Sequence, residues 1–279
     1  MPGRRALGLL HLTGAGTARD AEEAARWFRL SAERGDTKSA ADLANLVLRG
    51  QGDPADLAHT RRWFEEAANA GDLVAAFNYG VCLAEGVGIE RNERLAAQWL
   101  RRAAESVVNA QHYYGKMLVE GRGVAADPAE GRIWLSRAAE AGHAEAQVAL
   151  ADLLVHGKGG PRDHAAAYTL YSRAAGQGHV GAMFAAGALK GGGHEIPQDR
   201  AVAQDWFRAA AERGHALAQM MLGRYLARGI AGEQNIAEAR IWLERALAQG
   251  LTDVNADLAA LPPEPKAALE QASRQAAGD

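Results

Sequence analysis

The residues of this 279-residue chain that could support catalysis or metal binding are nine histidines, a single cysteine and a few glycine-rich segments. His156 and His164 flank the run Gly-Lys-Gly-Gly at 157–160, and together with Asp163 they could outline a metal site. The chain contains no His-Glu-x-x-His spacing, which is the arrangement that places two histidines on one face of a helix. Asp163 also has a structural explanation, given below. We therefore expect neither a metal nor a cofactor.

The other candidates also favour structural roles. The glycine runs at 157–160 and 191–193 do not continue into the Lys-Ser or Lys-Thr of a phosphate loop, and no Gly-x-Ser-x-Gly elbow occurs. Cys82 is the only cysteine, which rules out an intrachain disulfide and a zinc site built on several cysteines. It shares a sequence column with Leu10, Leu46, Met117 and Leu153, so we expect a buried thiol. No catalytic residue is predicted.

These residues belong to a repeat of about 36 residues. The tryptophans recur at intervals of 36, 36, 35, 72 and 36 residues, and Leu170 fills the missing position. They are Trp27, Trp63, Trp99, Trp134, Trp206 and Trp242. Thirteen residues before each mark lies a glycine, and seven before it lies an Asp or Asn. These columns are Gly14, Gly50, Gly86, Gly121, Gly157, Gly193 and Gly229, and Asp20, Asp56, Asn92, Asp127, Asp163, Asp199 and Asn235. Such regularity predicts repeated structural units.

Each repeat is predicted to be a helical hairpin of a helix A followed by a helix B. The Asp/Asn column supplies the N-cap of helix B, and Glu23, Glu130 and Glu238 stand where a capping box needs them. Six of the seven repeats place a glycine eight residues after the Trp position, which suits the left-handed end of helix B. His143 and His179 follow this glycine, as does His215, where other repeats have Asp, so we expect a turn or cap role.

Two columns indicate close packing. The tryptophans, predicted to be structural, are followed in most repeats by Ala-Ala one turn later, which favours a large ring against small neighbours. A stacking platform for bases or sugars is the alternative interpretation. In helix A a glycine column requires a close helix contact to offset its conformational cost of roughly 0.5–1 kcal/mol. This column is Gly8, Gly80, Gly115, Gly187 and Gly223, with Ala44 and Ala151 in the remaining repeats.

Composition narrows the function classes. The hydrophobic fraction is 48% with much alanine, aromatic residues make up 6%, and the formal charge is −3. A near-neutral chain has no overall field for nucleic acid or anionic lipid, so we expect no nucleic acid partner and no membrane insertion. The start, residues 1–10, superficially resembles a signal peptide, but its apolar run is short and it fits the first helix A. We expect a cytoplasmic protein, or a periplasmic one if an upstream signal peptide is missing.

The repeat resembles the Sel1-like repeats, which are related to tetratricopeptide repeats. The matching pattern is clearest in Tyr114-Gly115, Gly121-Arg122-Gly123, Asp127-Pro128, Trp134 and the segment 138–142. The resemblance covers about residues 3–254 and implies an all-α, right-handed α/α superhelical solenoid that binds partner proteins, often in bacterial signalling or assembly. Seven repeats are predicted, at 3–38, 39–74, 75–109, 110–145, 146–181, 182–217 and 218–254. Residues 255–279 are predicted to be a capping segment with a short helix, a break at Pro262-Pro263 and a second helix at 264–277.

A candidate binding surface follows from the columns that vary. Positions eight, five and one before the glycine that ends helix A share one helix face. The resemblance implies that helices A line the concave side, where these residues would bind a protein or peptide. They are Asp42, Asn45, Arg49, Asn78, Glu85, Tyr113, Lys116, Glu120, Asp152, His156, Met221, Arg224 and Arg228. The strip is predicted to be mixed to acidic in the middle and basic at its C-terminal end.

We therefore expect a non-enzymatic scaffold. The alternatives are a β-lactam-binding or hydrolysing enzyme, disfavoured because those Sel1-like proteins carry regular disulfides, and a regulator responsive to nucleotides. The third repeat is one residue short, and the segment Glu105–Asn109 lacks the usual glycine. A β-branched residue resists positive φ, so the connection there should take another backbone path and change the rotation between repeats three and four.

Overall fold

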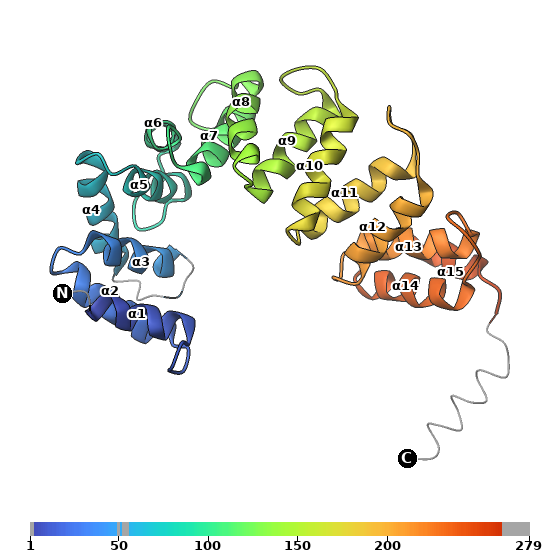
Figure 1. The fold of residues 1–279 in the computed structure, drawn as a ribbon, viewed down its shortest axis with the longest axis horizontal. Coiled ribbons are helices and arrows are strands. Elements are labelled where there is room, and N and C mark those ends of the chain that lie inside the picture. The colour runs from blue at the N-terminus through green and yellow to red at the C-terminus, as the bar shows by residue number, and fades with distance from the viewer. Residues whose placement is uncertain (1–2, 49–50, 52–55, 264–279) are drawn as a thin grey trace, which may run out of the picture. The chain divides into compact units, whose positions relative to one another are not determined.

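The computed structural model describes residues 3–48, 51 and 56–263, and these residues form fifteen α-helices and no strand (Figure 1). The helices are α1 (Gly3–Thr13), α2 (Ala21–Ala32), α3 (Thr37–Leu48), α4 (Asp56–Asn69), α5 (Leu73–Glu85), α6 (Glu93–Ala103), α7 (Val108–Glu120), α8 (Pro128–Glu140), α9 (Ala144–His156), α10 (His164–Gly176), α11 (Val180–Gly191), α12 (Arg200–Ala211), α13 (Ala216–Arg228), α14 (Ile236–Ala248) and α15 (Val254–Ala260). Odd-numbered helices are the predicted helices A and even-numbered ones the helices B. The all-α solenoid of helical hairpins is confirmed.

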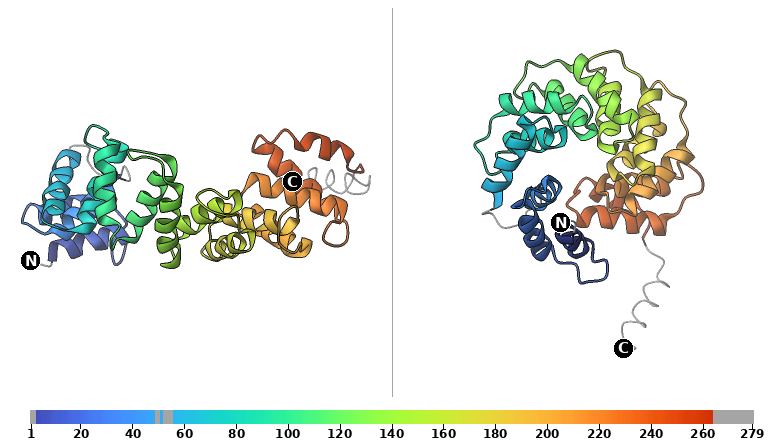
Figure 2. Two further views of the ribbon diagram at one scale, coloured as in Figure 1. Left: turned by 90° about the horizontal axis from the view of Figure 1, so that it is seen from above. Right: turned by 60° about the vertical axis from the view of Figure 1, so that its left-hand side comes forward.

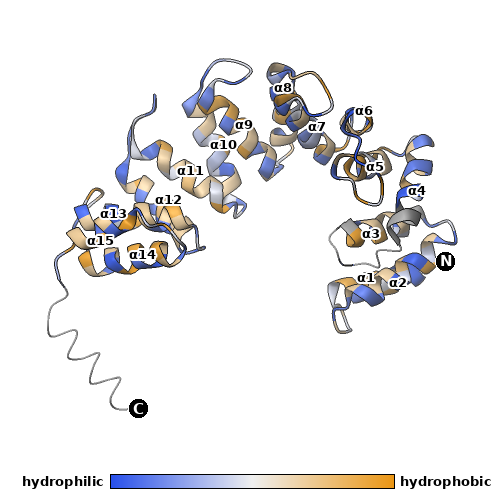
Figure 3. Cartoon of the chain, turned by 180° about the vertical axis from the view of Figure 1, so that it is seen from behind, coloured by the Kyte–Doolittle hydropathy of each residue, from blue (hydrophilic) through white to orange (hydrophobic). Residues whose placement is uncertain are grey.

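The chain divides into two compact units, one of residues 1–149 with 158–160 and one of residues 150–157 with 161–279. In each unit consecutive helices pack as hairpins (Figures 1 and 2). In the first unit α5 and α7 lie on the inner side of its curve, and α6 and α8 lie outside them (Figure 1). Helices of both units carry polar and apolar residues on different sides (Figure 3), as expected where each hairpin must bury one face against another.

The predicted N-caps form in the structure. Six side chains of the Asp/Asn column accept the backbone N–H three residues on, at 2.8–3.1 Å. They are Asp20, Asn92, Asp127, Asp163, Asp199 and Asn235. Asp56 is the first residue of α4, and its side chain lies outside the described part. The short polar side chain therefore starts helix B in every repeat where it is described.

The predicted capping boxes must be corrected. The backbone N–H of each N-cap donates to a carbonyl of the preceding helix A, as in Asn92 to Leu83 at 2.9 Å and Asp127 to Leu118 at 2.9 Å. The glutamates serve other groups. The Glu130 and Glu238 carboxylates accept from the indole N–H groups of Trp134 and Trp242 at 3.2 and 3.1 Å, and Glu23 pairs with Arg26 at 3.3 Å. The cap residue thus joins the two helices of one hairpin.

The glycines of helix A face a column of large buried residues on helix B, which confirms the predicted close contact. A Cβ built on Gly115 would lie 2.9 Å from Leu135 Cγ, and one on Gly8 would lie 2.5 Å from Phe28 Cε1. Gly80, Gly187 and Gly223 meet Leu100, Phe207 and Leu243 at 2.6–2.8 Å in the same way. All seven large residues of this column are at most 4% exposed. They are Phe28, Phe64, Leu100, Leu135, Tyr171, Phe207 and Leu243.

Each tryptophan lies one residue before this buried column of helix B. The expectation that the tryptophans form a core column needs correction. Only Trp242 is buried, at 7% exposed, and the other five are partly buried. The Trp134 ring meets Tyr114 edge to face at 5.8 Å, and the Arg137 guanidinium lies over it at 4.5 Å from its centroid. Arg102 over Trp99 and Arg245 over Trp242 repeat this arrangement. The tryptophans therefore form the border of the core, with an arginine covering the ring in three repeats.

The two glycines of the Gly-x-Gly turn are needed for different structural reasons. Gly121 ends α7 with φ +73°, a left-handed conformation that only glycine adopts without strain. A Cβ on Gly123 would lie 2.1 Å from the carbonyl oxygen of Glu93, at the start of α6 in the preceding hairpin. Gly159 approaches Pro128 in the same way, at 2.3 Å. The second glycine thus lets the turn of one hairpin touch the backbone of the hairpin before it.

The connection between α6 and α7 takes the different path that the sequence predicts. No described residue other than glycine has a positive φ. In this turn the Val107 N–H donates to Ala103 O, four residues back, at 2.9 Å, whereas at the next junction the His143 N–H donates to Ala138 O, five residues back. Val107 precedes α7 with no side-chain cap. The change of rotation between these repeats stays a prediction.

The last described helix agrees with the short helix predicted before Pro262. Helix α15 spans Val254–Ala260 and stops before Pro262, and Val254 is fully buried against α14. The predicted helix at 264–277 lies outside the described residues. Among the described residues, no helix is long and apolar enough to span a bilayer.

Candidate functional site

On α3, α5 and α7 of the first unit, the predicted strip has several residues that are accessible to solvent. Asn45 and Lys116 are exposed. The Glu85 and Glu120 side chains are 45% and 43% exposed. These residues stand five or one before the glycine that ends helix A. The two positions therefore present polar groups to solvent, as a binding surface requires.

Two of the strip residues that stand eight before that glycine contact the preceding helix A instead. Asp42 on α3 accepts from Arg5 Nε on α1 at 2.8 Å. Tyr113 on α7 is partly buried and packs edge to face on Phe77 of α5 at 6.1 Å. Asn78 is only 4% exposed, so the prediction that it belongs to the surface strip is wrong. This row mainly joins neighbouring hairpins, and only part of Tyr113 remains accessible.

Arg122 organises the charges around this part of the strip. Its guanidinium lies 3.1 Å from Glu93, 3.7 Å from Glu85 and 3.9 Å from Glu120. The hydrogen bond to Glu93 is the main reason that the pKa of Arg122 is raised. Hydrogen bonds from Arg91 and Arg122 lower the pKa of Glu93. The middle of the strip is therefore a network of both signs rather than an acidic patch.

Burial raises the pKa of the Tyr113 hydroxyl, and the nearby Glu85 carboxylate adds to the effect. A phenol in this state remains protonated at neutral pH and can donate a hydrogen bond. Tyr113 thus has an aromatic ring fixed by Phe77 next to charged groups of both signs. This combination of a rigid aromatic ring and polar neighbours is common where proteins bind other proteins.

In the second unit the strip residues make internal contacts. Asp152 accepts from the hydroxyl of buried Tyr171, and burial is the main reason that the pKa of Tyr171 is raised. His156 Nδ1 lies 2.7 Å from the Asp152 carbonyl oxygen. Asp152 and His156 are nevertheless exposed to solvent on α9.

The predicted basic end of the strip is paired with an acid. Arg224 Nε and Arg228 Nη2 lie 2.7 and 3.4 Å from the carboxylate of Asp257 on α15. The Arg228 side chain is still 65% exposed, whereas Arg224 is 29% exposed and Met221 is partly buried. The pairing offsets part of the positive charge there. Arg49 lies outside the described residues.

The histidine column has the cap role that the sequence predicts. The Nδ1 atoms of His143, His179 and His215 accept the backbone N–H three residues on, at 3.0–3.2 Å. Asp72 does the same at the start of α5 at 2.8 and 3.0 Å. Burial lowers the pKa of His143 and His215, which favours the neutral imidazole whose Nδ1 can accept.

The other residues considered for metal binding or catalysis also have structural contacts. Asp163 caps α10. His164 lies on the same helix, and its Nδ1 is 3.6 Å from a carboxylate oxygen of Glu195. Among the described residues no group of three or more His, Cys, Asp or Glu is placed to hold a metal ion. Cys82 is 3% exposed, and burial raises the pKa of its thiol to about 11, so it stays protonated. The prediction of a buried cysteine is confirmed.

The repeat units match a known family along nearly the whole described chain. The Sel1 repeat model matches residues 3–36, 37–72, 73–106, 108–143, 144–179, 180–215 and 216–251. The chain belongs to the Sel1 repeat family. Sel1 repeat proteins are generally scaffolds for protein–protein interaction, and the fold is typically non-catalytic. The division into repeats made from the sequence places each boundary two or three residues later, and it stays a prediction.

Two solved structures are similar to this Sel1 repeat chain. A Sel1 repeat protein from Oxalobacter formigenes is 32% identical with a TM-score of 0.72, over 91% of this chain and 74% of the other. A protective antigen of uropathogenic Escherichia coli that displays an SLR fold is 28% identical with a TM-score of 0.77, over 93% of this chain. The chain spans 56% of that antigen's length. No curated protein matches the chain.

Sequence reasoning missed the partners of the strip. Arg122 directly follows Gly121 in the loop after α7, and Asp257 lies on the last described helix. Neither shares a column with the strip, so periodicity gave no signal for them. It also missed buried glutamines such as Gln147, whose side-chain amide donates to Ala139 O at 3.1 Å and joins α8 to α9.

Proposed function

We propose that this Sel1 repeat protein is a non-enzymatic scaffold that binds a partner protein or peptide along its helices A, in a bacterial signalling or assembly process. The observation that carries the proposal is the group of Tyr113, Lys116, Glu85 and Glu120 on α5 and α7, in which Arg122 pairs with both glutamates. This group combines an aromatic ring with charges of both signs. The family's general role in protein–protein interaction supports the same conclusion.

The electrostatics favour selective recognition over general attraction. Lys116 and Arg122 are positive and Glu85 and Glu120 are negative, and these four residues lie on α5, on α7 and in the loop after α7. A partner must therefore match both signs, because placing like charges opposite one another across an interface is unfavourable. We expect the concave side of the helices A to be the face that a partner contacts.

A non-enzymatic role is consistent with how the reactive groups are used. Cys82 is buried and protonated, and three histidines cap helices through Nδ1. Each of these groups has a structural task. A β-lactam-binding or nucleotide-responsive protein remains the alternative, and thermal shift with a β-lactam set and a nucleotide set tests it.

The test is partner capture from a lysate of the protein's own cells, quantified by mass spectrometry. The main variant is the charge swap Lys116→Glu with Glu120→Lys, which keeps the net charge and leaves Tyr113 packed on Phe77. We expect loss of the captured partner with unchanged helicity and melting. Replacing Tyr113, Lys116 and Glu120 together by alanine should have the same effect on capture, with a modest loss of stability from the missing ring.

The matched control replaces Arg94, Gln98 and Glu105 by alanine; all three are exposed on α6 or in the turn after it. This control should capture the partner as the unmodified chain does. Retained capture by the charge-swap variant, together with loss in the control, would move the binding surface to the helices B.

A further inference from the structure

A pocket of about 430 Å³ lies in the first unit, between the end of α2, the start of α3, the second half of α4 and the start of α5. Its floor is apolar and includes Ala32, Ala40, Ala67 and Ala75. The volume is within the range of roughly 300–1,000 Å³ in which proteins hold small ligands or side chains. None of the residues that line the pocket belongs to the strip on the helices A.

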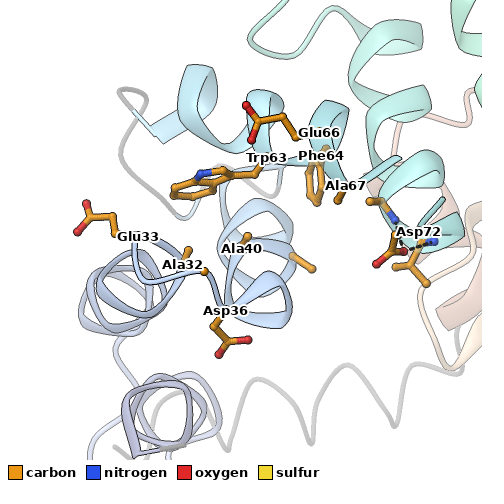
Figure 4. A pocket seen from close by; sticks show the side chains of 13 residues that line it. Ala32, Glu33, Asp36, Ala40, Trp63, Phe64, Glu66, Ala67 and Asp72 are labelled. Carbon is orange, nitrogen blue, oxygen red and sulfur yellow. Dashed lines mark hydrogen bonds between the residues drawn. The ribbon is translucent and has the colours of Figure 1, made fainter. Parts of the chain in front are cut away.

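The pocket joins one tryptophan to several acids. Trp63 forms part of its wall, and Glu33 and Glu66 lie near the two ends of the ring (Figure 4). Asp36 and Asp72, which cap α3 and α5, also line the pocket. Four of the thirteen lining residues are therefore acidic, and none is Lys or Arg. The wall thus combines an aromatic surface with a negative rim, which complements a side chain that has an apolar stem and a cationic end.

The chain itself shows which cation suits this tryptophan column. Three residues after Trp99, Trp134 and Trp242 stands an arginine whose guanidinium lies over the ring at 4.5–5.5 Å from its centroid. The corresponding residue after Trp63 is Glu66. At this repeat the column carries a carboxylate where four other repeats carry an arginine, three of which cover a tryptophan ring. The charge pattern is therefore reversed at the one tryptophan that lines the pocket.

We propose that this pocket binds an arginine side chain of a partner polypeptide. The guanidinium would stack on the Trp63 ring and pair with Glu33 and Glu66, while its aliphatic stem would cover the alanine floor. Arginine fits better than lysine because a planar guanidinium both stacks on aromatic rings and pairs with carboxylates. Arg62 pairs with Glu66 at 3.2 Å, but both side chains are more than 60% exposed, so this pair is weak competition.

The first test uses N-acetyl-arginine N-methylamide and its citrulline counterpart, which has nearly the same shape but no charge. The readout is the indole N–H signal of Trp63 in ¹H–¹⁵N NMR spectra, assigned with Trp63→Phe. We expect a saturable shift with the arginine compound, at least tenfold weaker binding of citrulline, and no shift of the Trp242 indole. Equal binding of citrulline, or of the lysine compound, would overturn the assignment of a guanidinium. No shift up to about 20 mM, well above a millimolar dissociation constant, would overturn the site.

The second test is Glu66→Arg, which places an internal arginine where four of the other repeats have one. We expect it to abolish binding of the arginine compound and to leave melting unchanged. Glu244→Arg on α14 makes the same charge change at an exposed position and should leave binding unchanged. Retained affinity in Glu66→Arg would contradict the proposal.

A third measurement distinguishes a polypeptide from a free amino acid as the occupant. A heptapeptide with one central arginine among alanines should bind at least as tightly as the arginine compound. Weaker binding of the peptide would overturn the polypeptide assignment. The charge swap at Lys116 and Glu120 should not affect either ligand, so failure here and failure of the strip are distinguishable.

Discussion

Leu135 and Trp134 are neighbours in α8, yet their surroundings differ. Leu135 is 1% exposed and packs directly on Gly115 of α7, inside one hairpin. Trp134 is partly buried, with Tyr114 at its edge, Arg137 over its face and Glu130 on its indole N–H. The smaller and less conspicuous column therefore forms the core, and the aromatic column forms its border. A residue type that marks a repeat is not necessarily the residue that contributes most to its stability.

The largest expected effect is that of Leu135→Ala. Removing a fully buried leucine against a glycine that cannot fill the space should cost about 3–5 kcal/mol. Trp134→Ala should cost less, on the order of 2 kcal/mol, because part of the ring is already exposed. Urea denaturation followed by circular dichroism compares the two, with Lys116→Ala as a surface control that should change stability little. A larger loss for Trp134→Ala than for Leu135→Ala would reverse the comparison of the two columns.

A smaller effect is expected from Gly115→Ala, which tests the other side of the same contact. The added Cβ would lie 2.9 Å from Leu135 Cγ and 3.1 Å from the Gly131 carbonyl oxygen, so the two helices must move apart. We expect a loss of about 1–3 kcal/mol, although alanine is the better helix former. The double variant Gly115→Ala with Leu135→Ala should lose less than the sum of the single losses, because the smaller side chain leaves space for the Cβ. Additive losses would show that the two residues do not share one contact.

The smallest effect concerns acid sensitivity near α7 and the start of α9. Burial lowers the pKa of His112 to about 4, the adjacent His143 adds to this, and burial also lowers the pKa of His143. Both folded-state values are below the unfolded value of about 6.5, so the unfolded chain binds more protons as the pH falls. Stability should be fully present above pH 6.5 and should decrease by about 1 kcal/mol between pH 7 and pH 5.

His112→Phe removes one of these titrations and should make the stability between pH 7 and pH 5 flatter. His143→Asp keeps the cap, as Asp72 does at α5, and removes the neighbouring imidazole, so it should also reduce the loss. Urea midpoints measured at both pH values test the pair. An unchanged slope in His112→Phe would show that this ring does not cause the acid sensitivity.

The sequence predicts the fold well because its signals are local. An N-cap such as Asn92 or a left-handed Gly121 depends on a few neighbouring residues, so its identity is visible in the repeat. The third repeat is one residue short near Val107, and this was visible in the sequence for the same reason. The prediction for the tryptophans was less accurate because the burial of a ring depends on the side chains packed around it, and the spacing of the tryptophans does not show these.

The binding strip was less predictable still. Its helix face could be derived from the spacing, but the burial of Asn78 and the pairing of Arg224 with Asp257 arise from side chains about 30 residues away in sequence or on a neighbouring helix. The pocket beside Trp63 was not predicted at all. It arises where four helices meet, and its only signal in the sequence was Glu66 at a position that carries arginine in four other repeats.

The pairing of Gly115 with Leu135 also bears on how such a chain can grow. Both partners lie within one stretch of 21 residues, and the same is true of Gly8 with Phe28 and Gly223 with Leu243. A gene duplication that copies one hairpin therefore copies both sides of its tightest contact at once. The new copy then needs only to fit its neighbours through small residues and a tryptophan ring, which tolerate change more readily. Gain or loss of whole repeats is accordingly an accessible evolutionary step for this architecture, while substitution within the glycine–leucine pair is not.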